Sequence, residues 1–124
     1  MRLGSVEIPM ETCRLVGDIL GHVGDKWAVL LIVLLRQGPR RFSELEREVG
    51  TVSKKMLTLT LRHLERDGYV TRKVTPSVPV RVDYALTELG EEVMVPLEHL
   101  AQWALDNRER VVGAREAYDR TAGT

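Results

Sequence analysis

The sequence contains a single cysteine, Cys13, and few aromatic residues. One cysteine cannot form a disulfide within the chain, which argues against the disulfide-stabilised class of small secreted domains. The longest apolar run, over residues 27–35, is too short to span a bilayer. The first twenty residues include Glu7, Glu11 and Asp18 and lack the compact apolar stretch of a secretory signal. These absences predict a soluble cytoplasmic protein of one domain, without a membrane partner.

Motifs of catalysis and metal binding are also missing from the sequence. His22, His63 and His99 are scattered and share no metal-ligand spacing with Cys13. There is no glycine-rich phosphate loop, no nucleophile elbow and no paired-carboxylate arrangement. We therefore expect a protein that is not an enzyme and that uses neither a metal nor another cofactor.

The formal net charge of the 124 residues is zero, but the charges are unevenly distributed. Eleven lysines and arginines lie between Arg36 and Arg81, against five acidic residues in the same segment. The rest of the chain is correspondingly acidic. A polyanion such as DNA responds to the local field, so a basic centre is compatible with a nucleic-acid partner despite the neutral total.

Hydrophobic periodicity and capping residues predict a mainly helical first half. Four helices are expected, over residues 11–23, 26–37, 40–49 and 54–66, the second of them stopped by Gly38 and Pro39. Asp25 and Ser53 are suitable N-caps for the second and fourth helices, because their side-chain oxygens can accept the free N–H groups of a first helical turn. The second helix is apolar nearly all round and is expected to be buried, with Trp27 packed in the core.

Two strands and a long helix are expected in the second half. Residues 69–74 and 80–86 alternate as strands do, and two prolines in the linker between them predict a stiff, exposed hairpin tip. Thr87 is expected to cap the last helix, and Pro96 should kink it. We expect a flexible N-terminal arm over residues 1–10, one domain over 11–112 and a C-terminal tail over 113–124.

The fourth predicted helix has two faces of different chemistry. Leu57, Leu61 and Leu64 form an apolar stripe, and the opposite face is basic. Two short helices joined by a tight turn and followed by a hairpin are typical of a winged helix-turn-helix, whose second helix enters the DNA major groove. We therefore predict contacts to double-stranded DNA from Arg41, Ser53, Lys54, Lys55, Thr58, Leu59, Arg62 and Arg81. The cations would bind phosphate or guanine, the hydroxyls would add hydrogen bonds, and Leu59 would pack on a thymine methyl.

Each of these assignments has a plainer alternative. The basic face of residues 54–66 could be a solvated surface whose arginines pair with Glu65 or Asp67. Arg81 could equally contact the minor groove or phosphate, or pair with an acid across the hairpin. Trp103 belongs either to the core or to a seam between two copies of the chain.

At the level of whole segments, the sequence resembles the HxlR-type transcriptional regulators over about residues 13–105. The resemblance rests on Cys13, on "GDKWAVLLIVLLRQGPRRFSEL", on "VSKKMLTLTLRHLERDGYVTR" and above all on the wing "PSVPVRVDYALTELG". It implies a DNA-binding repressor or activator with a winged helix-turn-helix fold that dimerises through its first and last helices. Family members often carry Gln at the positions of Leu59 and Thr60, so the operator sequence cannot be transferred from relatives.

Assembly and regulation follow as further expectations. The apolar faces of the first and last helices exceed what one small domain can cover, so we expect a homodimer that uses Leu15, Ile19, Leu100 and Trp103. Cys13 is a candidate redox or electrophile sensor, since some members of the resembled family sense through a cysteine at this place; its alternative is a packed, inert thiol. Two other functions stay open: a winged-helix protein–protein module, and a dimer that binds a small-molecule effector, with DNA output secondary.

Overall fold

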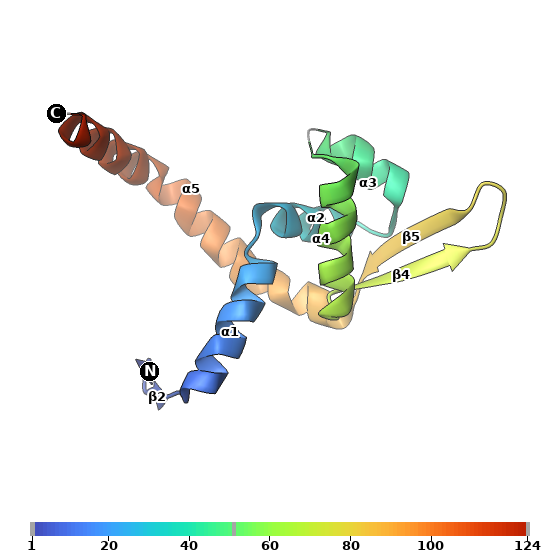
Figure 1. Cartoon of the computed structure of the whole chain (residues 1–124), viewed down its shortest axis with the longest axis horizontal. Coiled ribbons are helices and arrows are strands. Elements are labelled where there is room, and N and C mark those ends of the chain that lie inside the picture. Colours follow the sequence, from blue (N-terminus) through green and yellow to red (C-terminus); the bar gives the residue numbers. More distant parts are fainter. Residues whose placement is uncertain (1, 51, 124) are drawn as a thin grey trace. The chain divides into compact units, whose positions relative to one another are not determined.

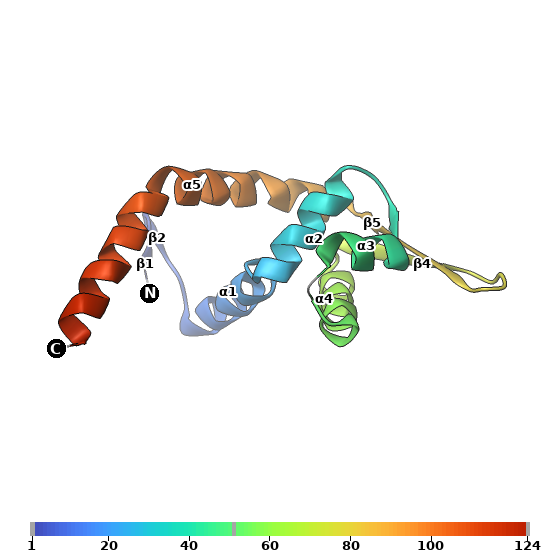
Figure 2. The same cartoon turned by 90° about the horizontal axis from the view of Figure 1, so that it is seen from above.

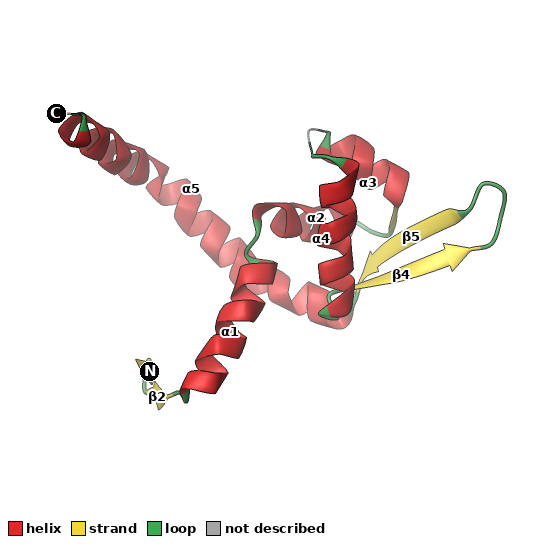
Figure 3. Ribbon diagram, viewed as in Figure 1, coloured by secondary structure: helices red, strands yellow, loops and turns green. Residues whose placement is uncertain are grey.

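The computed structural model describes residues 2–50 and 52–123. Figure 1 labels the five helices and the strands β2, β4 and β5, and Figure 3 distinguishes helices, strands and loops. In chain order they are β1 (Arg2–Leu3), β2 (Val6–Glu7), α1 (Met10–Val23), α2 (Lys26–Arg36), β3 (Arg40–Arg41), α3 (Phe42–Val49), α4 (Lys54–Arg66), β4 (Val70–Thr75), β5 (Arg81–Leu86) and α5 (Glu88–Ala122). No helix among the described residues is long and apolar enough to cross a membrane.

The fold is mainly helical with a small antiparallel hairpin, as the sequence predicts. The chain divides into two compact units, Met1–Glu92 and Val93–Thr124. The first unit contains every strand, α1 to α4 and the start of α5, and it therefore holds the whole helix-turn-helix and its wing. The second unit consists of the remainder of α5.

The predicted helix caps are confirmed. The Asp25 carboxylate accepts hydrogen bonds from the backbone N–H groups of Trp27 and Ala28, at 3.0 and 3.3 Å. Ser53 Oγ accepts the N–H of Met56 at 3.1 Å. These bonds satisfy donors that lack partners inside the first turn of a helix, so they fix where α2 and α4 begin.

The core of the first unit lies between α2 and α4. The apolar stripe predicted for α4, Leu57, Leu61 and Leu64, is almost completely inaccessible to solvent, as are Leu31 and Ile32 of α2. This burial orients α4, because the face opposite the stripe must then point outward. Trp27 is only half-buried, so its predicted place in the core is wrong in degree. The Lys26 ammonium lies over its ring instead, 4.9 Å from the centroid.

The hairpin belongs to a three-stranded sheet with the order β3-β5-β4. The sequence predicts only two of these strands, since it assigns Arg40 and Arg41 to a helix. Instead they pair with Tyr84 and Asp83, and α3 begins at Phe42. The third strand ties the wing to the beginning of α3. Figure 2 shows the β4–β5 hairpin extending beyond α3 and α4.

Both ends of the chain have more regular structure than the sequence pattern indicates. Short strands β1 and β2 pair across a turn in which Gly4 has a φ of 59°, within the segment expected to be a flexible arm. Helix α5 contains Pro96 and continues to Ala122, past Gly113, where the periodicity fades. Residues 113–122 are therefore helical, and the division into arm, domain and tail stays a prediction.

Candidate nucleic-acid interface

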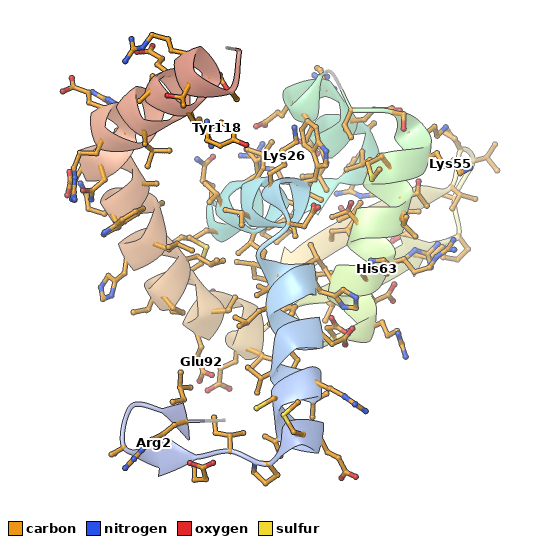
Figure 4. All side chains as sticks on the ribbon, turned by 60° about the vertical axis from the view of Figure 1, so that its left-hand side comes forward. Arg2, Lys26, Lys55, His63, Glu92 and Tyr118 are labelled. Atoms are coloured by element: carbon orange, nitrogen blue, oxygen red, sulfur yellow. The ribbon has the colours of Figure 1, made fainter. Side chains whose placement is uncertain are left out.

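Helix α4 presents a solvent-exposed face that is basic but not purely polar. Lys54, Lys55 and Arg62 are exposed, and Leu59 between them leaves 42% of its surface accessible. Figure 4 shows Lys55 on the outer side of α4. Lys54 Nζ lies 6.0 Å from the centroid of the Phe42 ring. Cations that surround an exposed aliphatic side chain are suited to the base edges and phosphates of a major groove.

The two hydroxyls predicted to face DNA are partly engaged by the helix itself. Thr58 Oγ1 donates to the backbone carbonyl of Lys54 at 2.8 Å, and Ser53 Oγ serves as the N-cap acceptor. Ser53 keeps its O–H proton available for a phosphate oxygen, whereas Thr58 can only accept a further hydrogen bond. Thr60, which follows Leu59, is buried and bonds the carbonyl of Met56, so it does not belong to the outer face.

A groove of about 700 Å³ separates α3 and α4 from the wing. Four of the residues predicted to contact DNA line it together, namely Arg41, Thr58, Arg62 and Arg81. The structure adds a residue that no sequence motif singles out, Arg72 of β4. Arg72 pairs with Tyr84 of β5 in the sheet register. Arg72 shares its strand face with Val70 and Val74, so alternation alone did not indicate a cation facing a groove.

Arg81 has a partner within its own strand. Its Nε donates to Asp83 Oδ2 at 2.9 Å, and Nη2 donates to Oδ1 at 3.2 Å. The Arg81 guanidinium thereby holds the pKa of the Asp83 carboxyl below its usual range. Of the two alternatives for Arg81, the pair with an acid across the hairpin is not observed, because Arg81 faces Thr75 on β4 and its acid lies two residues along β5. Residues i and i+2 of a strand share a face, which brings the two side chains together.

The arginines around the wing differ in whether an acid neutralises them. Arg40 binds Glu48, and Arg81 binds Asp83. Within residues 2–50 and 52–123, Arg41, Arg62 and Arg72 have no ion-pair partner. The alternative that Arg62 serves Glu65 or Asp67 is therefore not what the structure shows. Positive charge is left uncompensated on the side of α4 that faces the wing.

A cluster of titratable groups joins α1 to the other end of α4. His22 Nδ1 lies 2.8 Å from Asp67 Oδ2, and the His22 and His63 rings stack with centroids 4.9 Å apart. Figure 4 shows His63 on the side of α4 turned toward α1. The hydrogen bond with Asp67 raises the pKa of His22 above its ordinary value. Sequence spacing could not reveal this cluster, because the two histidines are 41 residues apart in the printed sequence.

The residues expected at a dimer seam are accessible in each unit taken alone. Leu15 and Ile19 of α1 are 59% and 40% exposed, and Leu100 and Trp103 of α5 are 63% and 55% exposed. Trp103 is therefore not buried within its own unit, α5 from Val93 onward. Cys13 lies in the first turns of α1, half-buried, with Sγ 3.8 Å from the Ile8 carbonyl oxygen.

Comparison with known proteins agrees with this geometry. The model of the HxlR-like helix-turn-helix family matches residues 22–112. The uncharacterised HTH-type transcriptional regulator YtfH of Escherichia coli K12 is 44% identical over 99 residues, which cover 80% of this chain and 79% of YtfH. Among solved structures, the putative transcriptional regulator ytfH from Salmonella typhimurium superposes with a TM-score of 0.73 at 44% identity, over 82% of this chain and 90% of that one.

A redox regulator, HypR in its reduced form, is also similar. Its TM-score is 0.72 at 36% identity, and the match covers 79% of this chain and 97% of HypR. The family match spans α2, α3, α4 and the wing, which are the elements that build the basic face and the groove. The chain belongs to the HxlR-like helix-turn-helix family of DNA-binding transcriptional regulators.

Proposed function

We propose that this regulator binds an inverted-repeat operator in double-stranded DNA as a homodimer. Helix α4 enters the major groove, and the β4–β5 wing contacts the neighbouring backbone. The observation that carries the proposal is the division of α4 into a buried stripe and an exposed face bearing Lys54, Lys55, Leu59 and Arg62. Packing of the stripe against α2 turns these four side chains toward solvent.

The exposed face combines sequence-independent and sequence-dependent contacts. Lysine and arginine attract phosphates and fix the position of the protein on the duplex. Leu59, set among them, provides an apolar contact that favours a thymine methyl over the polar edges of the other bases. Preference for particular operators then depends on Leu59 and its neighbours, and the overall affinity depends on the cations.

Dimerisation would use the apolar surfaces of α1 and α5. Leu15 and Ile19 are large apolar side chains that remain accessible within the first unit, and Leu100 and Trp103 remain accessible within the second, which is costly in water. A two-fold dimer presents two copies of α4, and their half-sites should lie one helical turn apart, about 34–36 Å.

Regulation through Cys13 extends the proposal. The thiol lies in the first turns of α1, the helix that also bears Leu15 and Ile19, so an adduct there would add bulk beside the proposed seam. The similarity to a redox regulator favours a redox or electrophile signal over an unrelated small-molecule effector. In operator binding before and after diamide, wild type should respond and Cys13→Ser should not. Equal responses would exclude Cys13 as the sensor.

The function itself is tested by footprinting the DNA upstream of the protein's own coding sequence. Wild type should protect two half-sites of an inverted repeat, and Lys55→Ala should protect them only at higher protein concentration. The matched control is Arg115→Ala, which removes an exposed cation from α5. Equal protection by all three proteins would contradict the role assigned to α4.

A further inference from the structure

The groove between α3, α4 and the wing is lined by four arginines. We propose that it is a phosphate-binding site, in which Arg41, Arg62 and Arg72 hold backbone phosphates of one DNA strand while Arg81 is reserved for Asp83. The inference rests on the proposed function and assigns a task to Arg72, which neither the sequence motifs nor the family match single out.

The first supporting observation is that, within the described part of the chain, one of the four arginines lining the groove forms an ion pair and the other three do not. Arg81 lines the groove but is neutralised by two hydrogen bonds from its guanidinium to the Asp83 carboxylate. The remaining three arginines of the lining have no ion-pair partner among the described residues. Glu65 is the acidic residue of the lining, so the three unpaired guanidiniums leave two positive charges uncompensated. Two singly charged phosphodiesters would balance that excess.

The second support is the origin of the three cations. Arg41 precedes α3, Arg62 is on α4, and Arg72 is on β4. Gathering like charges from three elements around one groove costs electrostatic free energy in the unbound protein, and a bound anion reverses the sign of that contribution. Guanidinium groups also suit the anion, because their planar array of donors matches two phosphate oxygens at once.

The surroundings of the groove fit a sugar–phosphate backbone. Ser43 and Thr58 contribute hydroxyl oxygens to the lining, and Phe42, Pro79 and Val80 contribute apolar surface. Such a mixture can accept phosphate oxygens beside deoxyribose carbon atoms. It offers few groups that could read the hydrogen-bonding edges of bases, so contacts here should position the protein without selecting a sequence.

A division of labour along α4 follows from this assignment. Arg62 faces the groove and acts as a phosphate contact, although its residue type would also allow it to read guanine. Sequence preference is then left to the exposed side chains nearer the start of α4, Lys55 and Leu59. Arg72 binds phosphate directly and thereby fixes how the wing lies against the DNA backbone.

The test compares three proteins by the salt dependence of their affinity for one duplex. Arg72→Gln should reduce the slope of log affinity against log salt by about 0.9, the value for one lost phosphate contact. Its preference for operator over unrelated duplex should stay at the wild-type ratio. Arg47→Gln is the matched control, since Arg47 is an exposed arginine of α3 outside the groove, and it should keep the wild-type slope.

The same assay tests whether the ion pair with Asp83 keeps Arg81 from binding phosphate. The double substitution Arg81→Gln with Asp83→Asn removes both charges of the pair and should leave the slope unchanged. Three outcomes would overturn the groove assignment. Arg72→Gln could keep the wild-type slope, Arg72→Gln could change the sequence preference, or the double substitution could reduce the slope as much as Arg72→Gln does. Wild type without salt-dependent duplex binding would instead contradict the proposed function.

A measurement without DNA distinguishes a failure of the groove assignment from a failure of the proposed function. In a titration of the full-length protein with inorganic pyrophosphate, the guanidinium Nε–Hε signals of Arg41, Arg62 and Arg72 should shift together in NMR spectra. The Arg81 signal should move less, because Asp83 already holds its Nε–H. The controls are Arg47 and Arg120, an exposed arginine in the last turn of α5. Shifts of these two signals equal to those in the groove would mean unspecific ion association and would overturn the proposal.

Discussion

Replacing Gly90 with alanine should destabilise the protein, although the same change in most helices is favourable. Gly90 lies in the first turn of α5, packed against the residue that precedes β4. A Cβ atom there would lie 2.2 Å from the carbonyl oxygen of Tyr69 and 2.9 Å from a methyl carbon of Leu86. The Tyr69 carbonyl cannot move away freely, since it accepts the N–H of Thr87 at 3.0 Å.

The magnitude follows from two opposing contributions. Alanine in a helix is favoured over glycine by about 0.5–1 kcal/mol, because glycine loses more backbone entropy on folding. Forcing an extra carbon into a closely packed site costs about 1–3 kcal/mol. The cost at Gly90 should lie at the upper end of this range, because the atom in the way is the backbone carbonyl oxygen of Tyr69, which cannot rotate away as a side chain can. The net expectation is a loss of about 2 kcal/mol in the free energy of unfolding.

Urea denaturation at one fixed protein concentration measures this loss. Gly17→Ala is the matched control, because Gly17 is a helical glycine of α1 where an added methyl group would meet no atom within 4 Å. It should gain up to about 1 kcal/mol. If Gly90→Ala proved as stable as Gly17→Ala, the close approach of α5 to Tyr69 would be refuted.

Three further outcomes are expected. The hydrogen bond with Asp67 raises the pKa of His22 in the folded protein. The contribution of this bond to stability is therefore complete below pH 6.5 and is lost as the pH rises through the pKa of His22 in the folded protein. Asp67→Asn should therefore flatten the fall in unfolding free energy above pH 6.5, and parallel curves for the two proteins would contradict this. Leu100→Asp should convert the dimer to monomer in sedimentation velocity at micromolar concentration, whereas a monomeric wild type would exclude the proposed seam. Leu59→Gln should change base preference at one operator position by about 1–3 kcal/mol without altering the salt slope, and an unchanged preference would remove Leu59 from recognition.

The sequence predicts the parts of the fold that depend on local chemistry. Asp25 and Ser53 cap their helices as expected, because a cap needs only a side-chain oxygen and the following two or three N–H groups. The apolar stripe of α4 is equally local, since helical periodicity places Leu57, Leu61 and Leu64 on one face. The basic face follows from the same periodicity, because it lies opposite that stripe.

Features that depend on distant segments were not predictable in this way. Arg40 and Arg41 form a strand only because β5 offers free backbone groups beside them, so tertiary pairing overrides their helical context. Arg72 enters the groove through the twist and register of the hairpin, and the contact of His22 with Asp67 depends on how α1 meets α4. The acid that binds Arg81 is its i, i+2 neighbour on the same face of β5 and not a residue across the hairpin, because the cross-strand position opposite Arg81 holds Thr75.

Selection of bound duplexes from a random-sequence library would show whether two copies of α4 read an inverted repeat. Wild type should enrich two symmetry-related half-sites whose centres are about 10–10.5 base pairs apart. Lys55→Ala should enrich the same arrangement with weaker discrimination within each half-site. Enrichment of a single asymmetric site, or no enrichment over the starting library, would contradict the account.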